Sequence, residues 1–301
     1  TRVRSSAASD VYKRQSPKGI RIRIKSERFA SLADKHVAAV RYSVTAEEQP
    51  VVKGDLNLNL RATINTAVGN NDLMHWESVD EGHANEVIWL QSHTRHTDVQ
   101  LIQGMSFTTQ ATGFSKQMFA SDIAPDIQFQ GKLSPGETVT AEKIVVMYTT
   151  RDVEAPLQAA LNHHIRLMQN SQSTEGNAYE ALLAEHVDAW QRFWQTSDII
   201  IEGDDKAQQA VRYSIYQLRI SASPDDSRYS IAAKGLTGFG YRGHIFHDTE
   251  IFMLPFFAYV HPSIARNLLL YRYHLLPAAR AKAKHNGCLL YTSDAADDLT
   301  R

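Results

Sequence analysis

The apolar residues of this chain change their spacing once, near residue 154. Before that point they alternate with polar residues, as Ile20, Ile22 and Ile24 do, which is the period of a strand with one buried face. After that point they follow the period of an amphipathic helix. Because one element cannot satisfy both periods, the sequence predicts a β-rich part followed by a helical part.

Further segments with strand character are separated by turn sequences such as AVGNND and LSPGE. These segments are residues 40–44, 56–64, 86–94, 98–107, 126–133 and 138–150. Many short strands without intervening helices favour an antiparallel arrangement over a parallel sheet. We therefore expect an N-terminal antiparallel β-sandwich over residues 16–152.

Several histidines and tryptophans lie in or near the predicted strands. They are His75, Trp76, His83, Trp89, His93 and His96. Such residues either line a surface that faces carbohydrate or, more commonly, belong to an aromatic core and a solvated sheet edge. The sequence leaves both interpretations open.

The helical part begins with two amphipathic segments, 154–169 and 178–195, which we expect to form a helical linker over residues 153–197. In the second segment one predicted apolar face consists of Leu183, Val187, Trp190 and Trp194. Its tryptophans are either sugar platforms or, as the helical spacing favours, core residues. Further helices are predicted over 205–222, from about 248, and from Pro262 to Gly287, with Pro277 inside the last. Residues 198–287 then read as the opening of an all-helical domain.

Charge and cysteine content exclude several classes of protein. The chain has 32 Lys and Arg residues against 33 Asp and Glu residues, so we expect binding neither to nucleic acid nor to an anionic membrane. Cys288 is the only cysteine, which rules out an internal disulfide and suits a reducing compartment. No apolar stretch reaches membrane-spanning length, and no apolar signal core begins the chain. We expect a cytoplasmic protein.

Both ends of the chain differ from the patterned sequence between them. Residues 1–15, TRVRSSAASDVYKRQ, and 288–301, CLLYTSDAADDLTR, lack a helical or strand period. They resemble translated sequencing-adapter sequence, and we expect both to be artefactual tails. The natural gene is then expected to continue beyond residue 287.

The stretch GYRGHIFHDTEIFMLPFF, residues 240–257, gathers polar groups between a glycine-rich turn and a bulky apolar run. On a helix, His244, His247 and Asp248 would share one face and present a possible zinc site. The glycines instead favour a loop as far as about residue 246, with Asp248 near the helix start as an N-cap. Glu250 would then interact with the helix dipole. A capped helix, a polar small-molecule site and a metal site all remain open from these residues alone.

The run from residue 232 to 287, which contains this stretch, resembles the signature region of glycoside hydrolase family 65, nearest to its kojibiose phosphorylase-like branch. The segment IEGDDKAQQAVRYSIYQLRIS resembles the first helix of that family's catalytic barrel, and SERFASLADKHVAAVRYSVTA resembles its N-terminal sandwich. The resemblance covers residues 16–287. It implies a multidomain β plus all-α fold: a large β-sandwich, or supersandwich, a helical linker, and the first helices of an (α/α)6 barrel over residues 198–287.

The family signature reads FWDTE, where this chain has Phe246-His247-Asp248-Thr249-Glu250. The resemblance implies that His247 and Asp248 bind substrate, with His247 replacing the usual tryptophan. It implies supporting roles for Arg242, His244 and Glu250. No metal is expected.

The family's general-acid glutamate lies in a GPDEYH-like motif, which does not occur in this sequence. We therefore expect no catalytic residue within the chain and no activity from the chain alone.

The family's members are mostly inverting disaccharide phosphorylases. The resemblance implies cleavage of an α-linked glucose disaccharide or oligosaccharide by inorganic phosphate, a co-substrate, to give β-glucose 1-phosphate without a cofactor. It also implies a possible homodimer at full length. A hydrolase of the same family is an alternative, and it requires a second carboxylate to activate water. A carbohydrate-binding sandwich without activity is the alternative from another class.

Overall fold

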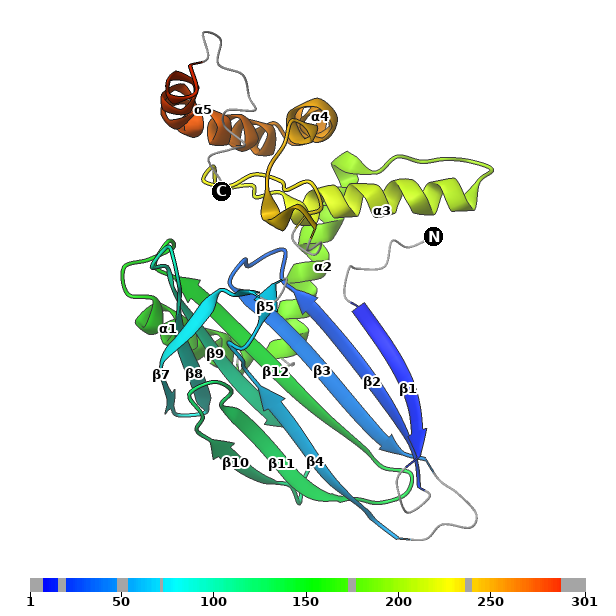
Figure 1. The fold of residues 1–301 in the computed structure, drawn as a ribbon. Coiled ribbons are helices and arrows are strands. Elements are labelled where there is room, and N and C mark those ends of the chain that lie inside the picture. Colours follow the sequence, from blue (N-terminus) through cyan, green and yellow to red (C-terminus); the bar gives the residue numbers. More distant parts are fainter. Residues whose placement is uncertain are drawn as a thin grey trace. The chain divides into compact units, whose positions relative to one another are not determined.

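A computed structural model describes residues 8–15, 20–47, 54–70, 73–172, 177–235 and 240–287. The chain forms two compact units, Thr1–Gln191 and Arg192–Arg301 (Figure 1). The boundary lies inside one helix of the segment 153–197. None of the helices in the described ranges combines the length and apolar character that crossing a membrane requires.

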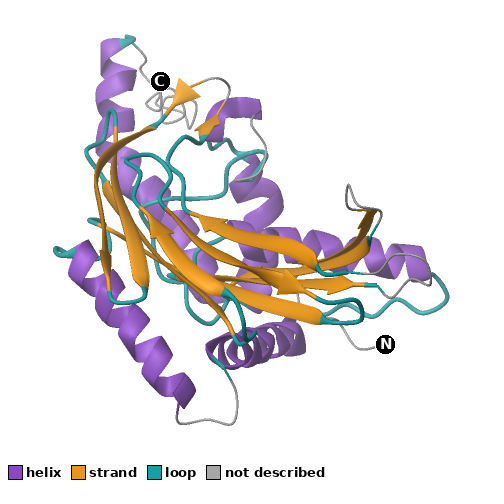
Figure 2. Cartoon of the chain, turned by 90° about the horizontal axis from the view of Figure 1, so that it is seen from below, coloured by secondary structure: helices purple, strands orange, loops and turns teal. Residues whose placement is uncertain are grey.

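The first unit is built on a seven-stranded antiparallel sheet. Its strands are, in order, β1 (Ala8–Gln15), β2 (Arg21–Ala30), β3 (Val37–Ala46), β12 (Thr138–Thr149), β9 (Gln100–Thr109), β8 (Val87–Thr94) and β7 (Trp76–Ala84). The strands change direction progressively across this sheet, as Figure 2 shows, which is the usual β-sheet twist.

A second, three-stranded antiparallel sheet packs against the first. It has the order β10 (Ser115–Phe119), β11 (Asp126–Leu133) and β4 (Leu56–Thr63). A short ribbon of β5 (Gly69–Asn70) and β6 (Leu73–Met74) completes the strands of the described residues. The antiparallel β-sandwich predicted from the sequence is confirmed.

Strand β1 differs from the sequence expectation, which found no strand period in residues 1–15. Ala8–Gln15 pairs with β2 along its whole length, for example Val11 opposite Lys25. The physical reason is its edge position: Val11 and Tyr12 are 59% and 47% exposed, so β1 is held by backbone pairing and needs no buried face. Residues 1–7 and 288–301 lie outside the described residues, and the adapter origin of the tails stays a prediction.

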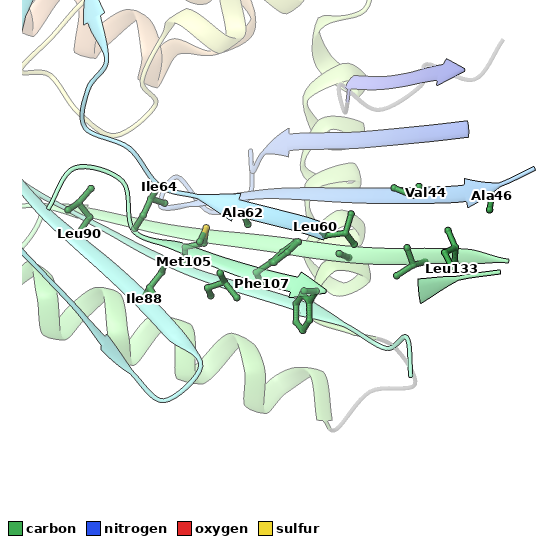
Figure 3. Packing of buried hydrophobic residues seen from close by; sticks show 14 of the residues in the cluster. Val44, Ala46, Leu60, Ala62, Ile64, Ile88, Leu90, Met105, Phe107 and Leu133 are labelled. Carbon is green, nitrogen blue, oxygen red and sulfur yellow. The ribbon is translucent and has the colours of Figure 1, made fainter. Parts of the chain in front are cut away.

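The main core of the first unit lies between the two sheets. Strand β4 contributes Leu60 and Ala62, and Ile64 follows directly after it. These side chains meet side chains of the larger sheet, such as Met105 and Phe107 (Figure 3). These side chains are at least nine-tenths buried. Burying one large aliphatic or aromatic side chain contributes roughly 1.5 to 3 kcal/mol to folding, so this layer dominates the stability of the sandwich.

Helices cover the opposite face of the larger sheet. Helix α1 (Pro156–Gln172) packs against β8, β9 and β12, and the beginning of α2 (Ala178–Ser197) joins the same core. The buried residues of this second core include Val37 and Ile144 from the sheet and Ala160 and Tyr179 from the helices. Central strands of the larger sheet, such as β3 and β12, are thus buried on both faces.

The buried face of α2 is not the predicted one. The buried residues are Ala178, Tyr179, Leu182, His186, Trp190, Phe193 and Ser197, whereas the expected face was Leu183, Val187, Trp190 and Trp194. The difference arises because His186 is 1% exposed although its side chain is polar. Its Nδ1 accepts a hydrogen bond from the Leu32 backbone N–H at 3.1 Å, and burial lowers its pKa, so the neutral ring behaves as a core residue.

Helix α1 also buries a histidine against the sheet. The His164 ring is fully buried, and its Nε2 donates to the Gly104 carbonyl oxygen on β9 at 3.1 Å. A Cβ at Gly104 would lie 3.4 Å from this ring, so glycine allows the close approach. Burial lowers the pKa of His164 to about 4, and the neighbouring His163 acts in the same direction.

This histidine makes stability depend on pH in a defined window. The folded pKa of His164, about 4, lies below the ordinary value of 6.5, so below pH 6.5 the unfolded chain binds a proton that the folded chain does not. Stability is fully present above pH 6.5 and falls as pH decreases toward 4, by up to about 3 kcal/mol. We expect His164→Gln, which keeps a donor for the Gly104 carbonyl, to flatten this decrease in urea unfolding between pH 7 and 4.5. An unchanged slope in the variant would contradict this origin. It would assign the decrease to other groups, such as His186, whose pKa burial also lowers and which both proteins keep.

The second unit is helical in its described residues. It contains α3 (Asp205–Ser221), the 3-10 turn η1 (Gly240–Gly243), the π-turn η2 (Thr249–Met253), α4 (Leu254–Val260) and α5 (Pro262–His285). Asp204 caps α3 by accepting from the N–H groups of Lys206 and Ala207. Pro277 lies inside α5, which continues through it. The core of this unit joins Ala222 and Ile231 to Phe257, Ile264, Ala265 and Leu268.

Candidate functional site

The predicted site begins at a tight glycine turn in the second unit. In η1 the His244 N–H donates to the Tyr241 carbonyl at 2.8 Å, and the His244 carbonyl accepts from Ala233 at 3.3 Å. Gly243 has φ 81° and Tyr241 has φ 62°, which is rare for a residue with a side chain. Such strain persists only where the surroundings hold it, and it clusters at functional sites.

A π-turn follows the loop. The Leu254 N–H bonds to the Thr249 carbonyl, five residues back, instead of four. Pro255 accounts for the widened turn, because proline has no N–H and its ring would clash with the carbonyl of residue 251. Single π-turns within helices occur often at functional sites. The sequence predicted one helix from about residue 248, and the structure divides it into η2 and α4.

Thr249 anchors the start of this turn from the inside. Its side chain is buried, and its Oγ1 donates to the Ile231 carbonyl oxygen at 2.8 Å. The two residues are 18 positions apart in the sequence. This bond fixes the backbone next to Asp248 to the chain segment that precedes the glycine turn.

Glu250 is held by an arginine from α5. Arg272 Nε and Nη2 donate to the two carboxylate oxygens of Glu250, each at 3.0 Å. The same Nη2 lies 2.8 Å from the Phe246 carbonyl oxygen and 3.4 Å from that of Ile245. Glu250 was expected to interact with the helix dipole, but its main partner is this guanidinium.

Asp248 does not cap the helix, contrary to the sequence prediction. Its backbone is already helical, with φ −51° and ψ −34°, and its side chain makes no capping hydrogen bond. A capping residue normally has an extended backbone, which directs its carboxylate toward the second and third N–H groups of the helix. Asp248 and its neighbour His247 are both exposed. The Asp248 carboxylate is therefore available to a ligand.

The zinc alternative gains no support from the geometry. Among the described residues, no three histidine, cysteine, aspartate or glutamate side chains lie together in a way that would hold a metal ion. His244 is half-buried, with its ring 6.4 Å from that of Phe246. Arg242 lies in η1, but its side chain is outside the described part of the structure, so its predicted supporting role stays a prediction.

A pocket of about 520 Å³ lies beside the glycine turn. Its lining comes from α3, including Tyr213 and Gln217, and from residues 231–235 and Met253. Neither His247 nor Asp248 lines it. A second pocket, of about 550 Å³, lies in the first unit around Arg41 and Glu142. The two predicted sugar-binding residues are both exposed and line neither of these two pockets.

The six histidines and tryptophans singled out in and near the strands of the first unit have separate surroundings. Trp89 packs over β7, where a Cβ at Gly82 would lie 2.6 Å from its ring. His93 lies 3.4 Å from the Glu77 carboxylate, whereas His75, His83 and His96 are exposed. The arrangement favours structural and edge roles for these residues.

Sequence reasoning missed the residues that hold this site, Thr249 and Arg272. Thr249 carries a signal, because a threonine next to the signature aspartate is able to donate to a backbone carbonyl. Arg272 carries none that periodicity reveals, since it is 22 residues from Glu250 on another helix.

The contrast between Asp248 and Thr249 is testable in the chain itself. We expect Asp248→Ala to change the free energy of unfolding by less than about 0.5 kcal/mol, because the carboxylate is exposed and caps nothing, whereas removing a capping aspartate costs about 1 kcal/mol. Thr249→Val should cost roughly 1 to 3 kcal/mol, because it leaves the buried Ile231 carbonyl without its donor. Urea unfolding measures both. A loss of about 1 kcal/mol or more in Asp248→Ala would restore the helix-cap interpretation.

Comparison with family models gives two matches. The model for the glycosyl hydrolase family 65 N-terminal domain matches residues 4–193. The model for the family 65 central catalytic domain matches residues 212–291, which contain the glycine turn, the exposed pair and Arg272.

Individual proteins with known activities are also similar. The kojibiose phosphorylase of Halothermothrix orenii is 35% identical over 94% of this chain and 37% of its own length. The nigerose phosphorylase of Lachnoclostridium phytofermentans is 32% identical over 88% of this chain and 36% of its own length. The chain thus spans about a third of the length of these curated relatives.

A solved structure described as a candidate kojibiose phosphorylase from the human microbiome supports the fold. It matches 93% of this chain and 36% of its own chain with a TM-score of 0.80. At 23% sequence identity this likeness concerns the fold alone.

Proposed function

The chain belongs to glycosyl hydrolase family 65, and from that premise we propose that it is part of an inverting α-glucoside phosphorylase. The proposed reaction cleaves an α-glucosidic bond with inorganic phosphate and gives β-glucose 1-phosphate. The substrate is an α-linked glucose disaccharide or oligosaccharide. The names of the similar proteins, which are disaccharide phosphorylases, support this reaction class.

The observation that carries the proposal is the state of Asp248. By the resemblance of residues 246–250 to the FWDTE signature, this aspartate corresponds to the family's sugar-binding aspartate. It lies within the segment that matches the central catalytic domain. Its carboxylate is exposed and makes no capping bond. A carboxylate held on a firm backbone is able to accept hydrogen bonds from two adjacent sugar hydroxyls. Asp248 is thus proposed to bind the glucose whose anomeric carbon reacts.

His247 is proposed to act on the same glucose. An imidazole donates or accepts a hydrogen bond, but its face is smaller than that of the tryptophan usual at this position. His247 therefore gives more polar contact and less stacking area. We propose that this replacement changes the preference for the sugar bound before the scissile bond.

The chemistry divides between this chain and the rest of a full-length enzyme. A phosphate oxygen attacks the anomeric carbon opposite to the leaving oxygen, the glycosidic bond breaks, and the leaving oxygen takes a proton from a general acid. Because phosphate is itself a nucleophile, no carboxylate is needed to activate water, unlike in an inverting hydrolase. We assign no acid in this chain. Its residues bind and orient the glucose.

The test uses the full-length product of the encoding gene and compares Asp248→Asn with the unchanged protein. Kojibiose, nigerose, trehalose and maltose are supplied with inorganic phosphate, and glucose 1-phosphate is measured. We expect Asp248→Asn to lower kcat/KM by roughly ten- to a hundredfold, because one charge-assisted hydrogen bond is lost. The melting temperature should not change.

Asp205→Asn is the matched control, because Asp205 is an exposed aspartate in the first turn of α3 in the same unit. It should leave kinetics unchanged. Release of free glucose without phosphate would replace the proposal with a hydrolase. Turnover unaffected by Asp248→Asn would remove Asp248 from the sugar site.

A further inference from the structure

We propose that Arg272 is the positioning residue of the sugar-binding pair His247 and Asp248. It acts by clamping the chain on both sides of the pair. This inference rests on the proposed function of Asp248. It adds a residue of α5, outside the glycine turn and the signature motif.

The clamp is visible in the donor pattern of one side chain. On the N-terminal side of the pair, Arg272 Nη2 donates to the Phe246 carbonyl at 2.8 Å, with that of Ile245 at 3.4 Å. On the C-terminal side, Nε and Nη2 reach the two oxygens of Glu250 at 3.0 Å each. His247 and Asp248 lie between these two points of attachment.

Partial burial strengthens this arrangement. The side chains of Arg272 and Glu250 are only 17% and 22% exposed, so water competes less for their hydrogen bonds than at an open surface. The Thr249 hydroxyl holds the same segment from another direction through the Ile231 carbonyl. Asp248 is thereby exposed as a side chain while its backbone is attached before and after it.

The function of the clamp needs arginine. A planar guanidinium presents several N–H donors in a fixed fork, which matches a carboxylate and also reaches a carbonyl. A lysine ammonium keeps the charge and reaches Glu250 as a point charge, but it cannot reproduce the fork. Arg272→Lys should therefore preserve the ion pair with Glu250 and weaken the hydrogen bonds to the carbonyl oxygens of the loop. The expected consequence is a misplaced Asp248 in a folded protein.

A second arginine in the same unit provides a matched control. Arg212 donates to both oxygens of Asp198, from Nε at 2.8 Å and from Nη2 at 2.6 Å. The two side chains are 27% and 21% exposed, close to the values of the clamp. This pair holds α3 to the residue that follows α2, and neither partner belongs to the segment 244–250. Arg212→Lys thus measures the cost of weakening a similar ion pair elsewhere.

The deciding experiment is a double-mutant cycle on the full-length gene product. It compares Arg272→Lys, Asp248→Asn and the double variant by kcat/KM for phosphorolysis, with melting temperatures for each. We expect Arg272→Lys to lower kcat/KM about tenfold, because small displacements of positioned groups have large kinetic effects. In the Asp248→Asn background the same change should cost no more than about threefold, since only the positioning of His247 is then left to lose. Arg212→Lys should leave kcat/KM unchanged.

Each outcome decides for or against the clamp. An equal loss from Arg272→Lys in both backgrounds, or a loss shared by Arg212→Lys, would reduce Arg272 to a structural role and overturn the inference. Should Asp248→Asn alone have no effect, the proposed function of Asp248 fails, which the single variant reveals independently. If Arg272→Lys does not fold, Glu250→Gln loosens the same clamp with a side chain of equal size. Its loss should likewise shrink in the Asp248→Asn background, and an undiminished loss would contradict the clamp.

Discussion

The central strands of the larger sheet must be covered on both faces, and the layers of the first unit follow from this constraint. Along β3, Val44 and Ala46 face the smaller sheet, whereas Val37 and Ala39 belong to the core under the helices. Strand β12 divides its residues in the same way. Because successive side chains of a strand point to opposite faces, these strands need apolar residues at both odd-numbered and even-numbered positions. One layer is supplied by β4 and β11, and the other by α1 and the first turns of α2.

The same constraint decides what the sequence was able to reveal. Strand β4 has one buried face and alternates clearly, and its predicted range, 56–64, is close to the observed Leu56–Thr63. Edge strands such as β1 have no such pattern, because backbone pairing holds them without a buried face. The buried face of α2 was misassigned because histidine counts as polar in a periodic pattern, although His186 is buried. Its neutral ring accepts the Leu32 N–H and packs 4.8 Å from the ring of Phe29, which no periodicity records.

The candidate site shows a similar division. Glycines, a polar cluster and a following apolar run predicted a loop that leads into a helix, and the loop is observed up to the residues before Thr249. The N-cap prediction for Asp248 was wrong because its backbone is already helical and the next turn is a π-turn. Pro255 offered a hint of that turn, since proline has no N–H for the regular series of helical hydrogen bonds. The contact between Glu250 and Arg272 depends on how two helices pack, so it required the structure.

A well-positioned carboxylate is necessary for sugar recognition, but an open surface limits what it can achieve. Water competes for the Asp248 carboxylate, and a sugar hydroxyl that replaces one water contributes little net free energy. The same hydrogen bond becomes selective when water is excluded, because an unmatched partner then loses its solvation without compensation. Under the proposed function, a further surface must therefore cover the His247 and Asp248 pair in the active enzyme. On that proposal, Arg272 and Thr249 hold the pair in place, and discrimination between disaccharides depends on the groups that complete the cover.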